Sequence, residues 1–184
     1  MIILICLALG LLMRVASGRR LSDLGHARVR GEAGLMVLLI AQALLPLLRL
    51  SGVAARVGFV VWLATFPMLI SVAWINRRQT GMPTLGVGLA LNFAVIALNG
   101  GMPVFPEAVA AVSGAAASIP AGDFAHVLGT VATRLPWLGD VIPLAGPDWL
   151  RSVPSAGDLL LYIGVVGFIA GVGPASAADD GRGK

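Results

Sequence analysis

Residues 57–75 read VGFVVWLATFPMLISVAWI, and Asn76, Arg77 and Arg78 follow directly. The run carries no charged side chain over its whole length, which is about 28 Å of helix at 1.5 Å per residue. An apolar run of this length predicts a helix that crosses the roughly 30 Å hydrocarbon core of a bilayer. The arginine pair at its end predicts that this end faces the cytoplasm.

Four other apolar runs flank this one, near residues 1–17, 33–50, 83–99 and 156–174. We expect all five to be helices, because a lone strand cannot satisfy its backbone in hydrocarbon. Pro46 and Pro67 predict kinks in their helices. The expected fold class is therefore an all-α membrane protein with about five transmembrane helices. It would form one transmembrane domain over residues 1–175, followed by a flexible cytoplasmic tail over 176–184.

The composition agrees with this class. Hydrophobic residues make up 58% of the 184 residues and charged residues only 12%, against about 25% charged in a soluble domain. The net charge of +4 does not indicate nucleic-acid binding, because the basic residues lie at the ends of apolar runs. Cys6 is the sole cysteine, which excludes an internal disulfide. Met1 leads straight into an apolar run without a basic region or cleavage site, so we expect a retained span and not a signal peptide.

The basic residues are distributed unequally between the two sides of the expected bundle. One side holds nine: Arg14, Arg19, Arg20, Arg28, Arg30, Arg77, Arg78, Arg182 and Lys184. The other side holds four: Arg49, Arg56, Arg134 and Arg151. The positive-inside rule then predicts an outside N-terminus and a cytoplasmic C-terminus. If the short run 1–17 lies only at the interface, both termini share a side.

The strong preference for Arg over Lys, with abundant Ala and Gly, is typical of a GC-rich bacterial genome. The expected location is therefore the bacterial plasma (inner) membrane, crossed several times.

Residues 100–155 form the one long connection, which we expect to lie outside the cell. Pro106 predicts the first turn of a helix over Glu107–Ser113 that Gly114 closes. Asp123 predicts the cap of a second, amphipathic helix over Phe124–Val131, lying on the membrane surface. Trp137 and Trp149 are expected at the interface, and Arg134 and Arg151 are expected to bind headgroups or to pair with Glu107, Asp140 or Asp148.

Polar residues at this side supply the candidate site. Asn92, in the middle of the run 83–99, predicts an interhelical hydrogen bond, for example to Gln42 or Thr65, or alternatively a polar lining that leads to the loop. Asn99, Gly100 and Gly101 predict a helix end, or alternatively a backbone cradle for a ligand.

Asp140 and Asp158 are the candidate acids of this side. Ser155 and Asp158 have the spacing of a capping box. The two carboxylates could instead share a proton and activate water, with His126 as a further catalytic candidate. No longer hydrolase motif surrounds them. His126 is the only histidine on its side, so no metal site and no cofactor are expected.

The leading hypothesis is a non-enzymatic accessory or ligand- or lipid-binding membrane protein with an outward-facing loop site. The expected ligand-binding residues are Asn99, Gly100, Gly101, Arg134, Asp140 and Asp158. One alternative is an outward-facing hydrolase that uses Asp140 and Asp158. Another is a transporter or channel subunit, which would need more polar residues at mid-membrane than Asn92.

Membrane lipids are the expected partners, and nucleic acid is not. A partner membrane protein or a second copy could dock on two rows of small residues. These rows are Gly167-x-x-x-Gly171 and Gly86-x-x-x-Ala90-x-x-x-Ala94.

Several short motifs resemble one known family. They include Gly-Arg-Arg-Leu-Ser (18–22), Asn-Arg-Arg (76–78), Asn-Gly-Gly-Met-Pro (99–103), Leu-Gly-Asp-Val-Ile-Pro (138–143) and Ser-x-Gly-Asp (155–158). In this order they resemble a small bacterial membrane family described as domain of unknown function 5317. The resemblance implies an inner-membrane protein of several helices and no assigned activity.

Overall fold

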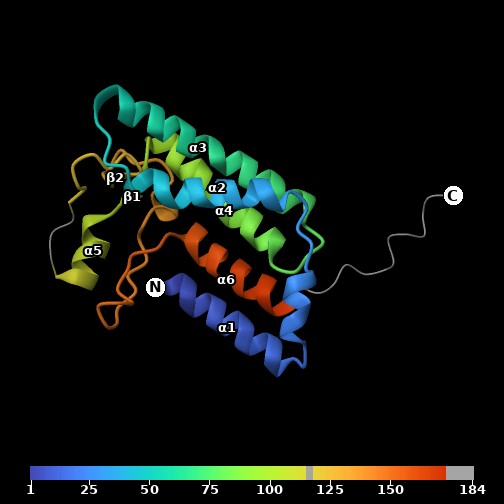
Figure 1. The fold of residues 1–184 in the computed structure, drawn as a ribbon. Helices are drawn as coiled ribbons and strands as arrows, with labels where there is room; N and C mark the ends of the chain where they lie inside the picture. Colours follow the sequence, from blue (N-terminus) through green and yellow to red (C-terminus); the bar gives the residue numbers. More distant parts are fainter. Residues whose placement is uncertain (115–117, 173–184) are drawn as a thin grey trace.

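Five long helices form the body of the protein in the computed structural model, which describes residues 1–114 and 118–172. They lie side by side and alternate in direction (Figure 1). These helices are α1 (Ile2–Ala16), α2 (Glu32–Leu44), α3 (Gly52–Ile75), α4 (Met82–Asn99) and α6 (Ala156–Gly171). Helix α6 packs between α1 and α4, and α3 packs between α4 and α2. The mostly helical fold expected from the sequence is confirmed.

Two of the described helices, α3 and α4, are long and apolar enough to cross a membrane. Three others are apolar but shorter: α1, α6, and α2 together with the 3-10 turn η2 (Leu45–Leu47). Large apolar side chains are exposed around the bundle, which a soluble monomer rarely shows over a wide area. They include Leu4, Leu12, Met36, Val37, Ile40, Val53, Val57, Val60, Met68 and Ile163.

The helix bounds differ from the expected ones at three places. Helix α3 begins at Gly52, five residues before the expected Val57. Helix α2 ends at Leu44, and the chain continues as η2 around Pro46, which cannot donate a backbone hydrogen bond. Helix α6 ends at Gly171, because the backbone of Val172 is already extended. The tail expected over 176–184 lies outside the described residues.

Glycines bring α4 and α6 into close contact. A methyl group added at Gly88 of α4 would lie 2.7 Å from the carbonyl oxygen of Gly157 in α6. One added at Gly164 of α6 would lie 2.6 Å from the side chain of Leu85 in α4. The row Gly167-x-x-x-Gly171 faces Thr80 and Gly81, at the turn before α4. These small residues therefore serve packing within the chain.

Two arginines donate hydrogen bonds to the C-terminal end of α6. The fully buried Arg14 of α1 donates through Nη1 to the carbonyl oxygens of Ile169 and Val172. Arg19 donates through Nη1 to the carbonyl oxygen of Gly171 at 2.7 Å. Cationic donors at a helix C-terminus satisfy its free carbonyls and its dipole.

The long connection gathers at the opposite end of the bundle, beside the start of α1 (Figure 1). Two short strands, β1 (Met102–Val104) and β2 (His126–Leu128), pair there in parallel, with Met102 opposite His126. Helix α5 (Pro106–Ser113) ends at the left-handed Gly114 and confirms the expected helix. The 3-10 turn η3 (Pro136–Leu138) follows in the same connection. Another 3-10 turn, η1 (Leu21–His26), lies at the opposite, arginine-rich end of the bundle.

The prediction of a surface helix over Phe124–Val131 is wrong. Asp123 does not cap a helix, because its Oδ1 accepts hydrogen bonds from the backbone N–H groups of Ala125 and His126 in a tight turn. The chain then enters β2. Phe124 is buried and joins an apolar core cluster that also holds Trp62, Phe66, Val95, Ile96, Met102 and Ala125.

Candidate functional site

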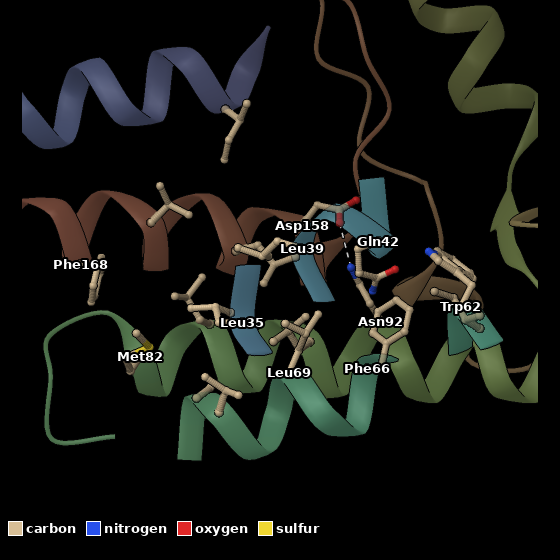
Figure 2. A pocket seen from close by; sticks show the side chains of 18 of the residues that line it. Leu35, Leu39, Gln42, Trp62, Phe66, Leu69, Met82, Asn92, Asp158 and Phe168 are labelled. Carbon is tan, nitrogen blue, oxygen red and sulfur yellow. Dashed lines mark hydrogen bonds between the residues drawn. The ribbon is translucent and has the colours of Figure 1, made fainter. Parts of the chain in front are cut away.

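A cavity of about 550 Å³ lies among α2, α3, α4 and α6 (Figure 2). Helix α2 packs on α3, and α6 packs on α4. The cavity lies between α2 and α6, and α3 and α4 supply the rest of its helical wall. Most of its wall is apolar. The apolar lining comprises Ile3, Val29, Leu35, Leu39, Trp62, Phe66, Leu69, Val72, Ala73, Met82, Leu85, Leu89, Ile96, Met102, Leu161, Val165 and Phe168.

Five polar side chains complete the wall: Gln42, Asn92, His126, Asp140 and Asp158. Figure 2 shows Asp158, Gln42 and Asn92 together at one end, with Phe168 and Met82 at the other. His126 and Asp140 come from the long connection, since His126 belongs to β2 and Asp140 bridges to β1 at Val104. The cavity is therefore amphipathic, and its polar end lies next to the long connection between α4 and α6, which we call the loop.

A hydrogen-bonded network orders this polar end. Asn92 Nδ2 donates to Asp158 Oδ1 at 2.8 Å, and Ser155 Oγ donates to Asn92 Oδ1 at 3.0 Å. The expected capping box is confirmed, because Asp158 N donates to Ser155 Oγ and Ser155 N donates to Asp158 Oδ2. Asn92 thus makes the interhelical hydrogen bond that its position predicted. Its partners lie in and before α6, and the expected partners Gln42 and Thr65 are wrong.

Two polar atoms beside this network have no hydrogen-bond partner in the described part of the chain. They are Nε1 of Trp62, whose side chain is buried in the cavity wall, and Oε1 of Gln42. An unsatisfied buried donor or acceptor costs about 1–3 kcal/mol, so such atoms are rare without a reason. The cavity wall therefore offers one free donor and one free acceptor.

Asp140 is fixed from its backbone and buried at its carboxyl. Its N–H donates to the carbonyl oxygen of Pro103 at 2.8 Å, and its carbonyl oxygen accepts from Phe105 N at 3.3 Å. Burial, and then the negative charge of Asp158, raise the pKa of Asp140 to about 8. At neutral pH this side chain therefore mostly keeps its proton and is uncharged.

His126 lines the cavity and forms its hydrogen bonds within the loop. Its Nδ1 lies 3.1 Å from Asp123 Oδ2, and Arg49 Nη1 lies 3.1 Å from the same oxygen. Burial acts to raise the pKa of Asp123, but the His126 charge and the hydrogen bonds from Ala125, His126 and Arg49 outweigh it and lower the pKa. Arg49 thus forms an ion pair that joins the segment before α3 to the loop.

The other expected site residues lie apart from the cavity lining. Asn99 donates through Nδ2 to the carbonyl oxygen of Arg134 and accepts at Oδ1 from Arg134 N, each at 2.9 Å. Gly100 is the left-handed residue that closes α4, and Gly101 lies against Val127. These residues clamp the loop onto the end of α4.

The remaining loop arginine forms a surface ion pair. Arg151 pairs with Asp148 at 2.8 Å, as one of the sequence alternatives expected.

Sequence reasoning missed two cavity residues as site residues, Gln42 and Trp62. Gln42 carries the one available signal, since it is the only polar side chain in the apolar stretch from Leu35 to Leu48. Trp62 has no signal of its own, because an indole in an apolar run is indistinguishable from core. Within the described residues, no group of three His, Cys, Asp or Glu side chains could hold a metal ion.

Comparison with known proteins places the chain in one family. The model of the Family of unknown function (DUF5317) matches residues 27–170, from the segment before α2 to the last turn of α6. No curated protein and no solved structure matches the chain. The match covers the helices that form the cavity and the loop that closes its polar end. The expected family is confirmed, although the motif at 18–22 lies outside the matched residues, and the chain belongs to the DUF5317 family.

Proposed function

We propose that this chain is an integral membrane protein whose helix bundle binds a lipid-like amphiphile. The apolar chain of the ligand lies between α2 and α6, and its polar head lies under the loop near Asn92 and Asp158. The observation that carries the proposal is the amphipathic cavity, which is apolar along most of its length and has two unpartnered polar atoms at its polar end.

The size of the cavity supports a small amphiphile and not a protein helix. Its volume of about 550 Å³ lies within the range of about 300–1,000 Å³ that is typical of small-molecule sites. Its lining along α6 runs from Asp158 to Phe168, or about 15 Å at 1.5 Å per residue. A helix about 10 Å wide would fill 550 Å³ within roughly 7 Å of its length, little more than one turn.

In this proposal all five long helices cross the bacterial inner membrane, with the N-terminus and the loop outside and the C-terminus in the cytoplasm. Three features support it. The helices alternate in direction, large apolar side chains cover their outer faces, and the arginine-rich turns lie at the end opposite the loop.

Cysteine labelling tests this orientation. In a Cys6→Ser background, we expect an impermeant maleimide to label Val131→Cys in intact spheroplasts and to label Leu21→Cys only after lysis. Both positions are exposed, and they lie at opposite ends of the bundle. Labelling of Leu21→Cys but not Val131→Cys in intact spheroplasts would reverse the topology.

Two neighbouring residues of α2 provide a matched test of the cavity. Leu39 lines it and Ile40 does not, yet the two are 49% and 53% exposed. Leu39→Trp should fill the cavity, so most of the co-purifying amphiphile should be lost from protein purified in mild detergent. Ile40→Trp should retain it. Mass spectrometry of the extracted lipid measures both, and circular dichroism checks folding. Equal retention in two folded variants would refute binding at this site.

One observation favours a second candidate, a membrane hydrolase. Asp140 and Asp158 line the same cavity, and the charge of Asp158 contributes to the raised pKa of Asp140. Against it, both oxygens of Asp158 already accept hydrogen bonds. A hydrolase predicts that the Asp140→Asn protein retains an uncleaved lipid heavier than the one bound to wild type. A binding protein predicts the same lipid in both.

A further inference from the structure

We propose that the cavity selects amphiphiles whose head is uncharged and carries hydroxyl groups, such as a long-chain alcohol, over those with a phosphate or an ammonium head. This inference rests on the proposed function and narrows its ligand class.

The free hydrogen-bonding atoms at the polar end supply the first reason. Gln42 Oε1 can only accept, and Trp62 Nε1–H can only donate. An ammonium head donates only, so it leaves the indole unsatisfied. A doubly ionised phosphate accepts only, so it leaves the amide oxygen unsatisfied. A hydroxyl group both donates and accepts, and its chemistry therefore fits the pair.

The charges of the wall supply the reason against an anion. The charged carboxylate of Asp158 lines the polar end beside the protonated Asp140, whereas no Lys or Arg side chain lines the described cavity. A phosphate placed there would lose its hydration next to carboxyl groups without gaining a cation partner. Burial of a charge without such compensation is strongly unfavourable.

The existing hydrogen bonds supply the reason against a cation. Asp158 could attract an ammonium group, but its two oxygens already accept from Asn92 Nδ2 and Ser155 N. Asp140 keeps its proton at neutral pH, because burial and the Asp158 charge raise its pKa to about 8. A buried ammonium head would have to displace this network to gain a partner.

Competition binding on the full chain in detergent tests the selection. The probe is tritiated oleyl alcohol, and the competitors are unlabelled oleyl alcohol, oleyl phosphate and oleylamine, which share one apolar chain. We expect the alcohol to compete about tenfold better than either charged lipid at neutral pH, a difference of about the size of one lost hydrogen bond.

Two substitutions test whether Trp62 Nε1 and Gln42 Oε1 cause the preference for the alcohol. Trp62→Phe removes the free donor, and Gln42→Leu removes the free acceptor. Each substitution should lower the affinity for oleyl alcohol about fivefold. Trp74→Phe is the matched control, because Trp74 is an exposed tryptophan of the same helix outside the cavity lining. It should leave binding unchanged. Trp62→Phe should not weaken oleylamine, which has no acceptor for the indole.

The outcomes separate the two proposals. Equal competition by all three lipids, with every binding signal lost in Leu39→Trp, overturns head selection and leaves amphiphile binding intact. Stronger competition by oleyl phosphate or oleylamine overturns it in the same way. Binding of oleyl alcohol that Leu39→Trp leaves unchanged contradicts the proposed function itself.

Discussion

Helix α6 faces α4 and α2 in opposite ways. Toward α4 it presents glycines, so that the two backbones come within one methyl group of each other at Gly88 and Gly157. Toward α2 it presents Leu161, Val165 and Phe168 across a cavity of about 550 Å³ (Figure 2). The bundle is therefore not loosely packed throughout. The open space between α2 and α6 lies on one face of α6, opposite a tightly packed face, as expected for a binding site and not for poor packing.

The largest effect should come from crowding the tight face. We expect Gly88→Leu to cost about 3 kcal/mol or more, because the new side chain meets the α6 backbone, which cannot move aside like a flexible side chain. Gly34→Leu in α2 is the control, since open space surrounds Gly34 and Leu favours a helix by up to about 1 kcal/mol over Gly. Thermal unfolding in detergent compares them, and equal melting temperatures would remove the distinction between the two faces.

The polar end of the open face should make stability depend on pH. Unfolded Asp140 loses its proton near pH 3.8 and folded Asp140 only near 8, so the folded state binds more protons between these values. Stability should therefore fall as pH rises, by about 1.4 kcal/mol per pH unit near the middle of this window. Asp140→Asn should abolish this slope. A slope that persists in Asp140→Asn would place the titrating group elsewhere.

A smaller effect should come from the clamp that holds the loop over the open face. Asn99→Ala removes the paired hydrogen bonds to the backbone of Arg134 and should cost about 1 kcal/mol. Because Asn99 does not line the cavity, affinity for oleyl alcohol should change less than twofold once the protein is folded. A large loss of affinity with unchanged stability would show that Asn99 contacts the ligand.

The tight face and the helices were predictable from local sequence. Apolar runs located all five long helices, and the Ser155 and Asp158 spacing predicted the start of α6. The small-residue rows predicted close approach, although not whether it lies within the chain. Each of these features depends on residues within a few turns of one another.

The open face was less predictable, because it depends on segments far apart in the chain. Phe124–Val131 has helical spacing, but a backbone hydrogen bond from Met102 N to Ala125 O and the pairing with β1 favour a strand. Gln42 was considered only as a partner for Asn92. Its oxygen has no hydrogen-bond partner among the described residues, and no local sequence pattern predicts this.

Quenching of Trp62 fluorescence tests most directly whether the open face binds a lipid. Trp74→Phe, Trp137→Phe and Trp149→Phe replace three exposed indoles and leave Trp62 as the sole reporter in the cavity wall. A matched variant that keeps only Trp74 reports on the outer surface. We predict that an oleyl alcohol analogue brominated along its chain quenches the fluorescence of Trp62 saturably and that excess oleyl alcohol reverses this quenching. Quenching of Trp74 should neither saturate nor be reversed. Identical, non-saturating quenching of both tryptophans would contradict a bound amphiphile.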